Sequence, residues 1–538
     1  MKSVARYFHT LRHLRPVQIV GRVRHKLHRP RPDLRPPPAP RGLAAAFAAP
    51  VAPAPSMPAA DRFRFLNVEQ LCATPGDWNV AGRAALWTYN LHYFDDLNAA
   101  GGAERAGWHR ALLDRWVEQN PPGAGPGWDA YPLSRRIVNW TKWAFGGERL
   151  SPAAHASLAV QARWLTQRLE YHLLGNHLFA NAKALVFAGL YFEGAEAEEL
   201  LRTGLAIVAS ELAEQVLEDG AHFELSTMYH AAALEDLLDL INVMRAAGRD
   251  VPAAWRGTAA RMQRWLDLLT HPDGGIAFFN DAAFGIAPTC AELRAYAARL
   301  GLAVAAITPR PIESLAASGY ARLTRGEFCL LADVAPIGPD YLPAHAHADT
   351  LSFELSIGQQ RVLVNSGTSE YGESPERLRQ RGTAAHNTVS VDGADSSEVW
   401  AGFRVARRAR ARLVSAVAGP VTELVGEHDG FLRLPGRNLH ARRWHLDERQ
   451  LLIEDRISGR FDHAEAYLHI HPDVQARRIA EHHFELRLPD ARLVPLQFSG
   501  AASTELRAGS WHPRFGSVLR NQVLVARFAG PRLQARLG

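Results

Sequence analysis

The pattern of apolar and polar positions divides the chain into a helical part followed by a strand-rich part. Between residues 87 and 310 apolar residues recur with helical spacing, and glycine or proline separates most of the segments. Helices of about 10 to 20 residues in series, with short connectors, predict helical hairpins arranged as a solenoid or toroid. The expected helices are Ala111–Gln119, Arg135–Phe145, Pro152–Leu174, Ala182–Glu193, Glu198–Glu218, Met228–Ala247 and Trp255–Leu269.

From about residue 318 the segments become short and alternating or rich in β-forming residues, with turn residues between them. Strand after strand without intervening helices predicts antiparallel sheets packed as a β-sandwich. The expected strands are Tyr320–Leu323, Phe328–Val334, Ser352–Ile357, Arg361–Asn365, Asn387–Val391, Ala411–Val417, Glu423–His428, Leu451–Ile457, Ala466–Ile470 and Val523–Phe528. The sequence Pro-Arg-Pro at residues 309–311 marks the boundary. We therefore expect an arm at 1–42, a helical domain at 43–310 and a sandwich domain at 311–538.

Composition narrows the class of protein without changing this outline. The chain has 538 residues, of which 47% are hydrophobic and 22% charged, as in ordinary globular proteins. It lacks an apolar run of about 18 residues, which argues against a transmembrane helix. Basic residues interrupt the N-terminal segment, so we expect no standard secretory signal, a cytoplasmic location by default and a periplasmic one as the alternative. Three scattered cysteines argue against a disulfide framework.

The positive charge is concentrated at the N-terminus. Residues 1–42 contain 11 Lys or Arg and one acidic residue, Asp33, so the remaining 50 basic and 54 acidic residues leave the body at −4. This distribution argues against a nucleic-acid-binding face on a domain. The arm could make peripheral contact with an anionic membrane or touch an acidic polymer, or it could be a solvated tail. Pro30 to Pro58 is rich in Pro and Ala and is expected to be a linker or extended strap.

One segment combines histidines with a strand pattern. His345, His347 and Asp349 share alternation parity with the apolar residues Leu351 and Phe353. If no bulge intervenes, two imidazoles and a carboxylate point to the buried side, where polar groups need partners. A metal, a substrate, a catalytic network or a purely structural set of hydrogen bonds could supply them.

Three other clusters carry candidate chemistry. The first, Gly175-Asn176-His177, lies where a loop meets a helix, and Asn or His there could also be a simple N-cap. The second runs from His222 to His230 and contains Tyr229, which could equally be a core aromatic. The third runs from Val362 through Tyr371 and on to Gly393, and it contains His386.

Together, and in this order, these clusters resemble the heparinase II/III-like polysaccharide lyase family. The resemblance covers most of the chain. It is strongest at His345–Ile357 and Val362–Gly393, good at Gly175–Leu185 and Phe223–Ala233, and visible at Trp128–Trp140. It implies an α/α toroid (an incomplete barrel of helical hairpins) followed by an antiparallel β-sandwich, which agrees with the two halves expected from periodicity. It also implies cleavage of an acidic, uronate-containing polysaccharide by β-elimination.

The resemblance implies roles for particular residues. β-Elimination needs a group that neutralises the uronate carboxylate, a base for the C5 proton and an acid for the departing O4. Asn176 resembles the neutralising amide, with His177 beside it. Tyr229 resembles the tyrosine that acts as base, acid or both, and His345 the catalytic histidine. Tyr371 resembles a second tyrosine near the site.

The resemblance also suggests a metal and a substrate-binding helix. Many members hold a zinc ion in the β half, and the corresponding positions are His347, Asn365 and His386. Asn365 departs from the family's Asp, and an amide oxygen is a weaker zinc ligand than a carboxylate. Without zinc, the two histidines could form a hydrogen-bonded layer that supports the catalytic histidine. Four further residues, on or near a helix that the family places at the substrate, are candidate substrate-binding residues: Trp128, Tyr131, Arg135 and Arg136.

Two alternatives to a lyase stay open. The first is a polysaccharide-binding or assembly protein that keeps the fold with weak or no turnover, which the basic arm and Asn365 motivate. The second is metal-assisted hydrolysis, with His345 and His347 activating a water molecule. The second lacks an obvious carboxylate ligand beyond Asp349. Formation of an unsaturated uronate would separate the lyase from both.

Overall fold

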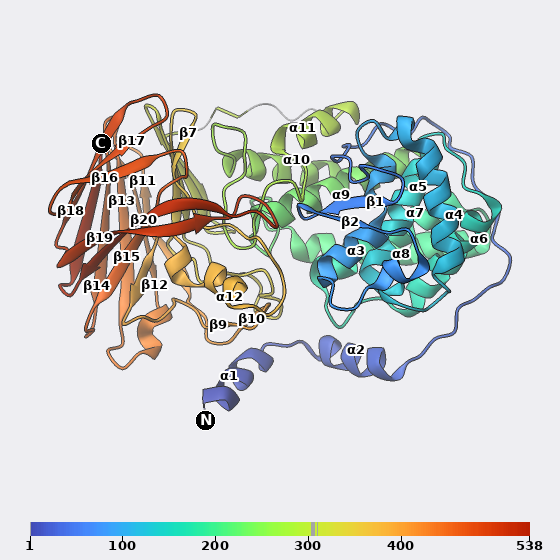
Figure 1. Cartoon of the computed structure of the whole chain (residues 1–538), viewed down its shortest axis with the longest axis horizontal. Helices are drawn as coiled ribbons and strands as arrows, with labels where there is room; N and C mark the ends of the chain where they lie inside the picture. The colour runs from blue at the N-terminus through green and yellow to red at the C-terminus, as the bar shows by residue number, and fades with distance from the viewer. Residues whose placement is uncertain (1, 303–306, 309) are drawn as a thin grey trace.

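Two unlike halves, one of helices and one of strands, lie side by side along the long axis of the molecule (Figure 1). The structure is a computed structural model that describes residues 2–302, 307, 308 and 310–538. It confirms an N-terminal α/α toroid followed by antiparallel β-sheets. None of the described helices is long and apolar enough to span a bilayer.

The helices occupy the arm and the first half, with one short helix in the second half. They are α1 (Lys2–Leu11), α2 (Pro16–Leu27), α3 (Ala85–Tyr93), α4 (Ala106–Gln119), α5 (Ala130–Phe145), α6 (Pro152–Gln167), α7 (Gly175–Tyr191), α8 (Ala195–Gln215), α9 (Thr227–Ala246), α10 (Ala253–Leu268), α11 (Cys290–Arg299) and α12 (Pro375–Arg381). Helix α7 is apolar on nearly every side and packs between α5, α8 and α9. A helix that is hydrophobic all round belongs at the centre of such a bundle.

The strands form three main sheets and two small hairpins. They are β1 (Arg62–Phe65), β2 (Val68–Leu71), β3 (Ile312–Leu315), β4 (Tyr320–Arg325), β5 (Phe328–Asp333), β6 (Phe353–Ile357), β7 (Gln360–Leu363), β8 (Val389–Val391), β9 (Val399–Trp400), β10 (Arg404–Val405), β11 (Ala411–Val417), β12 (Thr422–His428), β13 (Leu439–Leu446), β14 (Leu451–Ser458), β15 (Ala464–His469), β16 (Gln475–Ala480), β17 (His483–Arg487), β18 (Leu493–Ser499), β19 (Ser503–Trp511), β20 (Leu519–Phe528) and β21 (Arg532–Leu537).

The largest sheet has the strand order β11-β12-β13-β14-β21-β18-β17-β16. A four-stranded sheet, β19-β20-β15-β8, and a five-stranded sheet, β3-β4-β5-β6-β7, complete the β half. Side chains of all three sheets meet in one buried apolar cluster, for example Trp444, Leu524 and Phe353. Alternation along β12 to β14, with every second residue buried, is the pattern that sequence periodicity predicts for a sandwich face.

The chain changes from helices to strands between residues 299 and 312. Helix α11 ends at Arg299 and β3 begins at Ile312; Pro309 lies outside the described residues. Among described residues before 250, strands are limited to the hairpin of β1 and β2. The β half also contacts the first half directly, because Arg361 of β7 pairs with Asp273 in the loop after α10.

The expected strand through the two histidines is wrong. Strand β6 begins only at Phe353, and Leu351, two residues earlier, has a φ of 60°, in the left-handed region that an extended strand does not use. Residues 343–352 therefore form a loop, and their alternation does not set which way the histidines point. Strand β6 itself is buried on both faces. Its polar residue Glu354 is buried too, and is bonded by His271 at 2.9 Å.

The N-terminal arm is more ordered than a solvated tail. Helices α1 and α2 run along one edge of the molecule beneath both halves, and residues 28–58 follow the toroid without helices (Figure 1). Arg163 donates to the backbone carbonyls of Arg35 at 2.6 Å and Pro36 at 3.0 Å. Pro40 forms an isolated β-bridge with Phe192. The segment after α2 is thus an extended strap, as its composition predicts.

Candidate active site

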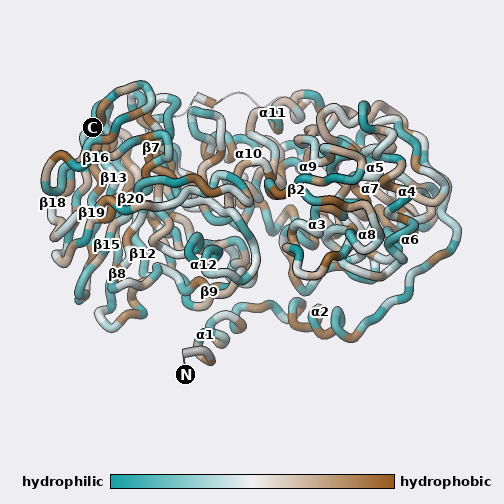
Figure 2. The backbone as a smooth tube through the Cα atoms, viewed as in Figure 1, coloured by the Kyte–Doolittle hydropathy of each residue, from teal (hydrophilic) through white to brown (hydrophobic). Residues whose placement is uncertain are grey.

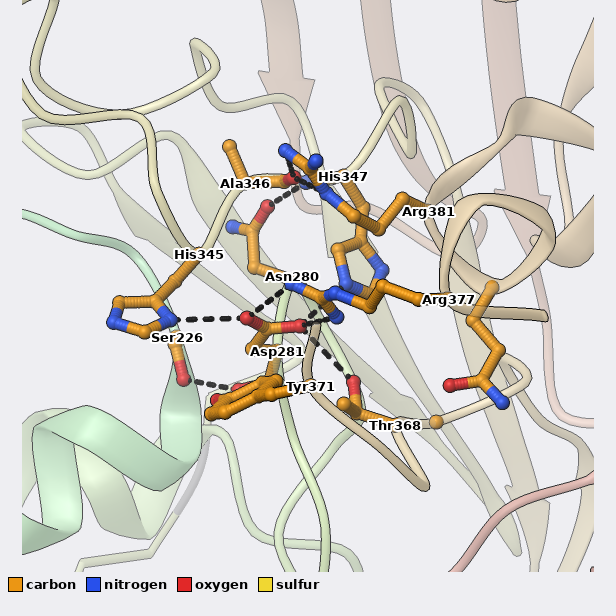
Figure 3. A network of polar contacts seen from close by, with 12 residues as sticks. Ser226, Asn280, Asp281, His345, Ala346, His347, Thr368, Tyr371, Arg377 and Arg381 are labelled. Atoms are coloured by element: carbon orange, nitrogen blue, oxygen red, sulfur yellow. Dashed lines mark hydrogen bonds and ion pairs between the residues drawn. The ribbon is translucent and has the colours of Figure 1, made fainter. Parts of the chain in front are cut away.

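A buried carboxylate, Asp281, organises the polar cluster where the two halves meet (Figure 3). It lies in the loop between α10 and α11. His345 Nδ1 lies 2.9 Å from one carboxylate oxygen, and His347 Nε2 lies 2.8 Å from the other. Arg377 of α12 donates to both oxygens, and the Thr368 hydroxyl donates to one at 3.2 Å. Residues from three other segments therefore converge on one side chain.

The charge of Asp281 is strongly stabilised. Burial alone would raise the pKa of its carboxyl group. The Arg377 guanidinium and the hydrogen bonds from His345 and His347 outweigh burial and hold that pKa well below its usual range. An ionised Asp281 accepts a hydrogen bond from His345 Nδ1–H. It thereby selects the tautomer that leaves Nε2 with a lone pair.

Tyr229, His345 and Tyr371 meet across the two halves. The rings of Tyr229 and His345 stack with centroids 3.8 Å apart, and the Tyr229 and Tyr371 hydroxyl oxygens are 2.9 Å apart. Ser226, the N-cap of α9, accepts from Tyr229 N–H at 3.1 Å and donates to the backbone carbonyl of Asp281 at 2.5 Å. The start of α9 is thus bonded to the loop that carries the central carboxylate. Three residues chosen from distant sequence segments share one site.

Both tyrosines are held in the protonated form. Burial is the largest cause that raises the pKa of Tyr229 and of Tyr371 well above 10, and the nearby Asp281 charge acts in the same direction. A neutral phenol is a hydrogen-bond donor and a proton source. The two tyrosines therefore suit the acid step of an elimination better than the first removal of a proton.

Asn176 and His177 begin helix α7, whose first N–H groups favour an anion. His177 Nδ1 lies 3.1 Å from a Glu170 carboxylate oxygen. Burial alone would lower the pKa of His177, but the Glu170 charge and hydrogen bond raise it overall. Gly175 has a φ of 56°, and a Cβ there would lie 2.2 Å from Leu342 Cδ2. Glycine at this position lets the helix start close to the β half.

Two of the four candidate substrate-binding residues lie near this helix start. The Tyr131 ring lies 4.6 Å from the His177 ring, and Arg135, one turn further along α5, pairs with Asp95 at 3.1 Å. The Arg135 side chain is 32% exposed.

The other two substrate-binding candidates are core residues, which corrects the sequence expectation. Arg136 is fully buried, donates to Gln161 Oε1 at 2.9 Å and lies over the Trp116 ring at 3.8 Å. Trp128 is buried and donates from its indole to the Asn120 carbonyl at 3.3 Å. Adjacent arginines on a helix point about 100° apart, so only Arg135 reaches the surface.

Glu224 is a buried carboxylate that faces the backbone N–H of Asn176 at the start of α7. One of its oxygens lies 3.5 Å from His345 Nε2, the nitrogen that does not face Asp281. Burial raises the pKa of Glu224. His345 thus lies between two carboxyl groups, one ionised and hydrogen-bonded and one whose charge is disfavoured.

His347, Asp349 and His386 form a group whose donor atoms lie within 4.8 Å of one another. His347 Nδ1 and His386 Nε2 face each other at 3.3 Å, and His386 Nδ1 has no partner among the described residues. Two imidazoles and a carboxylate fit the donor set of a zinc site. The hydrogen bond from His347 Nε2 to Asp281 would orient the His347 ring for such a metal. Asn365 has other partners: its oxygen accepts from the backbone N–H of Asn387 at 3.0 Å.

Sequence reasoning missed Asp281 and gave Glu224 no role. Asp281 stands in Phe278-Phe279-Asn280-Asp281-Ala282-Ala283-Phe284, where a carboxylate between apolar residues is a signal of a buried, partnered acid. Arg377 carries no comparable signal, because it lies in α12 among charged neighbours. The loop that carries Asp281 is about a hundred residues from Arg377, so only folding brings the pair together.

The chain matches two family profiles along most of its length. Residues 135–297 match Heparinase II/III N-terminus, and residues 307–537 match Heparinase II/III-like, C-terminal. Among curated proteins, FtsZ-localized protein C of Caulobacter vibrioides is 27% identical over 74% of this chain and 72% of its own length. A heparin-sulfate lyase of Bacteroides thetaiotaomicron is 24% identical over 61% of this chain, and the match spans about half of that lyase, 52%.

Solved structures share the fold. A crystal structure of heparinase III superposes with a TM-score of 0.70 at 18% identity, over 86% of this chain and 78% of that one. Heparan sulfate lyase HepC from Pedobacter heparinus gives a TM-score of 0.58 at 17% identity, over 97% and 86% of the two chains. Similarity at these identities supports the toroid-plus-sandwich architecture alone.

Proposed function

We propose, from the premise that this chain belongs to the heparinase II/III-like family, that it is a polysaccharide lyase that cleaves an acidic, uronate-containing polymer by β-elimination. The observation that carries the proposal is the contact of Tyr229 with His345 and Tyr371 across the two halves. A pure binding protein has no need for an oriented imidazole beside two protonated phenols. An elimination needs such a base and such an acid near one sugar.

The carboxylate of the uronate would lie at the start of α7. Its charge opposes formation of a carbanion at C5, so it must be neutralised as the proton leaves. The raised pKa of His177 favours the imidazolium, and the Asn176 amide and the helix N-terminus add hydrogen-bond donors. Arg135 would hold a further acidic group of the polymer.

Proton transfer would use His345 as the base and Tyr229 as the acid. His345, with Nδ1–H bonded to Asp281, would take the C5 proton at Nε2. Asp281 would stabilise the imidazolium that forms, as a buried carboxylate does for a histidine base. Tyr229 would protonate the departing O4 from its hydroxyl, and Tyr371 could return a proton through the 2.9 Å contact between the hydroxyls.

In this scheme the metal group supports His345 and does not contact the sugar. His347, Asp349 and His386 would hold the ion, which would supply a fixed positive charge that orders the loop of residues 343–352. His347 also shares Asp281 with His345. The metal group and the proposed base are therefore coupled through one carboxylate.

Incubation of the purified protein with a panel of sulfated and unsulfated uronate polymers tests the proposal. A lyase generates a new unsaturated uronate end, detected by ultraviolet absorbance and mass spectrometry. A hydrolase generates saturated ends with the mass of added water. Formation of the unsaturated product by the wild-type chain, and its loss in His345→Gln, would support elimination. Saturated products alone would overturn it.

A binding or assembly role without turnover is the second candidate. It is favoured by the relative named for its localisation with FtsZ, which is similar over 74% of this chain. If no polymer of the panel is cleaved but one binds, with affinity lowered by Arg135→Gln, the binding role replaces the lyase. The same panel therefore decides between the two functions.

A further inference from the structure

The N-terminal arm exposes an apolar surface that the rest of the molecule does not cover. Six residues define what we name the outer apolar face: Val4, Phe8 and Leu11 on α1, and Val20, Val23 and Leu27 on α2. Their side chains are between 51% and 77% exposed. On each helix the spacing by three, four or seven residues places them on one side. Figure 2 shows apolar positions recurring along this otherwise polar arm.

Other sides of the two helices are fixed to the body. On α1, the Thr10 hydroxyl accepts from the Trp400 indole at 3.1 Å, and the Tyr7 ring meets Trp400 edge-on. On α2, Gln18 is 2% exposed and donates to the Tyr341 carbonyl at 3.3 Å. A Cβ at Gly21 would lie 2.8 Å from the backbone nitrogen of residue 172, so the helix is seated closely. These contacts hold the outer apolar face toward solvent.

The charged side chains of the two arm helices are all basic. Residues 4–31 contain no Asp or Glu, and Arg12, Arg24 and Lys26 are exposed beside the apolar positions. Arg15 is different, because it turns inward to pair with Glu214. An apolar stripe bordered by cations complements the headgroups and outer acyl chains of an anionic lipid surface. A partner protein that covered only the apolar stripe would leave these cations unmatched.

We propose that residues 4–27 are an interfacial docking surface for an anionic membrane. Helices α1 and α2 would lie in the plane of the interface, with the outer apolar face among the acyl chains and the cations at the headgroups. Both helices lie along the same edge of the molecule, so they can engage one flat surface together (Figure 1). Neither half of the body has to open, because the contacts of the inner sides remain.

Co-sedimentation of the full chain with vesicles tests the proposal. Vesicles of phosphatidylcholine, with or without phosphatidylglycerol, are the probes. We expect binding only with phosphatidylglycerol, weakening as salt is raised. Each cation removed in Arg12→Gln, Arg24→Gln and Lys26→Gln should weaken binding by about fivefold. Phe8→Ser combined with Leu11→Ser should weaken it by roughly tenfold or more, because less apolar area enters the interface.

A matched control separates the arm from exposed apolar residues in general. The combination Ile479→Ser, Leu493→Ser and Val518→Ser alters residues of similar exposure on the β half and should bind vesicles like wild type. Circular dichroism and thermal unfolding check that every variant is folded. The proposal is overturned if wild-type protein does not bind anionic vesicles, or if the Phe8/Leu11 variant binds them as wild type does. Arm-dependent binding of a soluble acidic polysaccharide, with no vesicle binding, would also overturn it.

Discussion

Two buried networks in this protein have the same chemical composition and different surroundings. Around Asp281, two histidines and Arg377 surround one carboxylate. Around Asp455 of β14, His440 Nε2 lies at 2.7 Å and Arg442 donates at 2.7 and 2.9 Å, while His428 Nε2 lies 3.1 Å from His440 Nδ1. In both, burial alone would raise the pKa of the carboxyl group, but the arginine and histidine lower it.

The two networks differ in whether a histidine reaches the edge of the buried region. Asp455 and its partners lie on three neighbouring strands, and every side chain is enclosed by the sandwich. In the Asp281 network, His345 reaches the edge, where its ring stacks on Tyr229 from the helical half. A histidine bonded to a carboxylate is therefore a structural feature when all its atoms face the core. It becomes a candidate base when one nitrogen is left for a substrate.

The largest expected effect is on kcat, and it compares one tyrosine beside each network. Tyr229→Phe removes only a hydroxyl at the edge of the Asp281 network and should lower lyase kcat by at least about a hundredfold. Tyr467→Phe removes a buried hydroxyl in the sandwich, bonded to Glu465 at 2.7 Å, and should leave kcat nearly unchanged. Steady-state kinetics on the cleaved polymer measures both. Near-full activity in Tyr229→Phe would make this residue a core aromatic.

Removing the carboxylate charge should destabilise both networks alike. Asp281→Asn and Asp455→Asn each leave a buried arginine without its counter-charge, which costs about 3–5 kcal/mol of unfolding free energy. Denaturant unfolding measures this loss. Only Asp281→Asn should also lower the activity of the folded fraction, because His345 loses its orientation. Equal activity in the two folded variants would contradict the assignment of Asp281 as a positioning residue.

A smaller expected difference is in metal content: zinc should bind beside the Asp281 network and not at the Asp455 network. We expect about one zinc ion per chain in the purified protein, because His347, Asp349 and His386 fit its donor set. His386→Ala should remove it, whereas His428→Ala, in the sandwich network, should not. Elemental analysis measures both. Metal-free protein with full activity would instead assign these histidines to hydrogen-bonded support of His345.

The smallest expected effect is a pH shift at the start of α7. Because the Glu170 charge raises the pKa of His177, neutralisation by the imidazolium is present at low pH and is lost as pH rises through that raised pKa. Glu170→Gln should move this loss of kcat/KM to lower pH. Glu211→Gln alters a buried carboxylate bonded to Gln215, away from the site, and should leave the profile in place. Identical profiles in all three proteins would remove His177 from the mechanism.

The two-part architecture was predictable because hydrophobic periodicity is local. The positions of α9, α10, β5 and β12 follow closely from spacing in the sequence. Helix α7 begins at Gly175, before the expected start at Ala182, because Gly175, Asn176 and His177 have the composition of a loop. The sequence did not predict the two helices of the arm. Their apolar stripe is interrupted by arginines, and a stripe that packs on nothing resembles a solvated segment.

The sequence alone determined the fold class, and it predicted Tyr229, His345 and His177 as site residues because they stand in motifs that resemble a known family. Tertiary structure decided which groups act on them. Asp281 and Glu224 flank one imidazole although 57 positions separate them in the chain, and no periodicity relates them. Tertiary structure also decided that the Arg135 side chain is partly exposed whereas Arg136 is a core residue. Burial and long-range charge set the pKa and orientation of each group, and both depend on contacts that form only when distant segments meet.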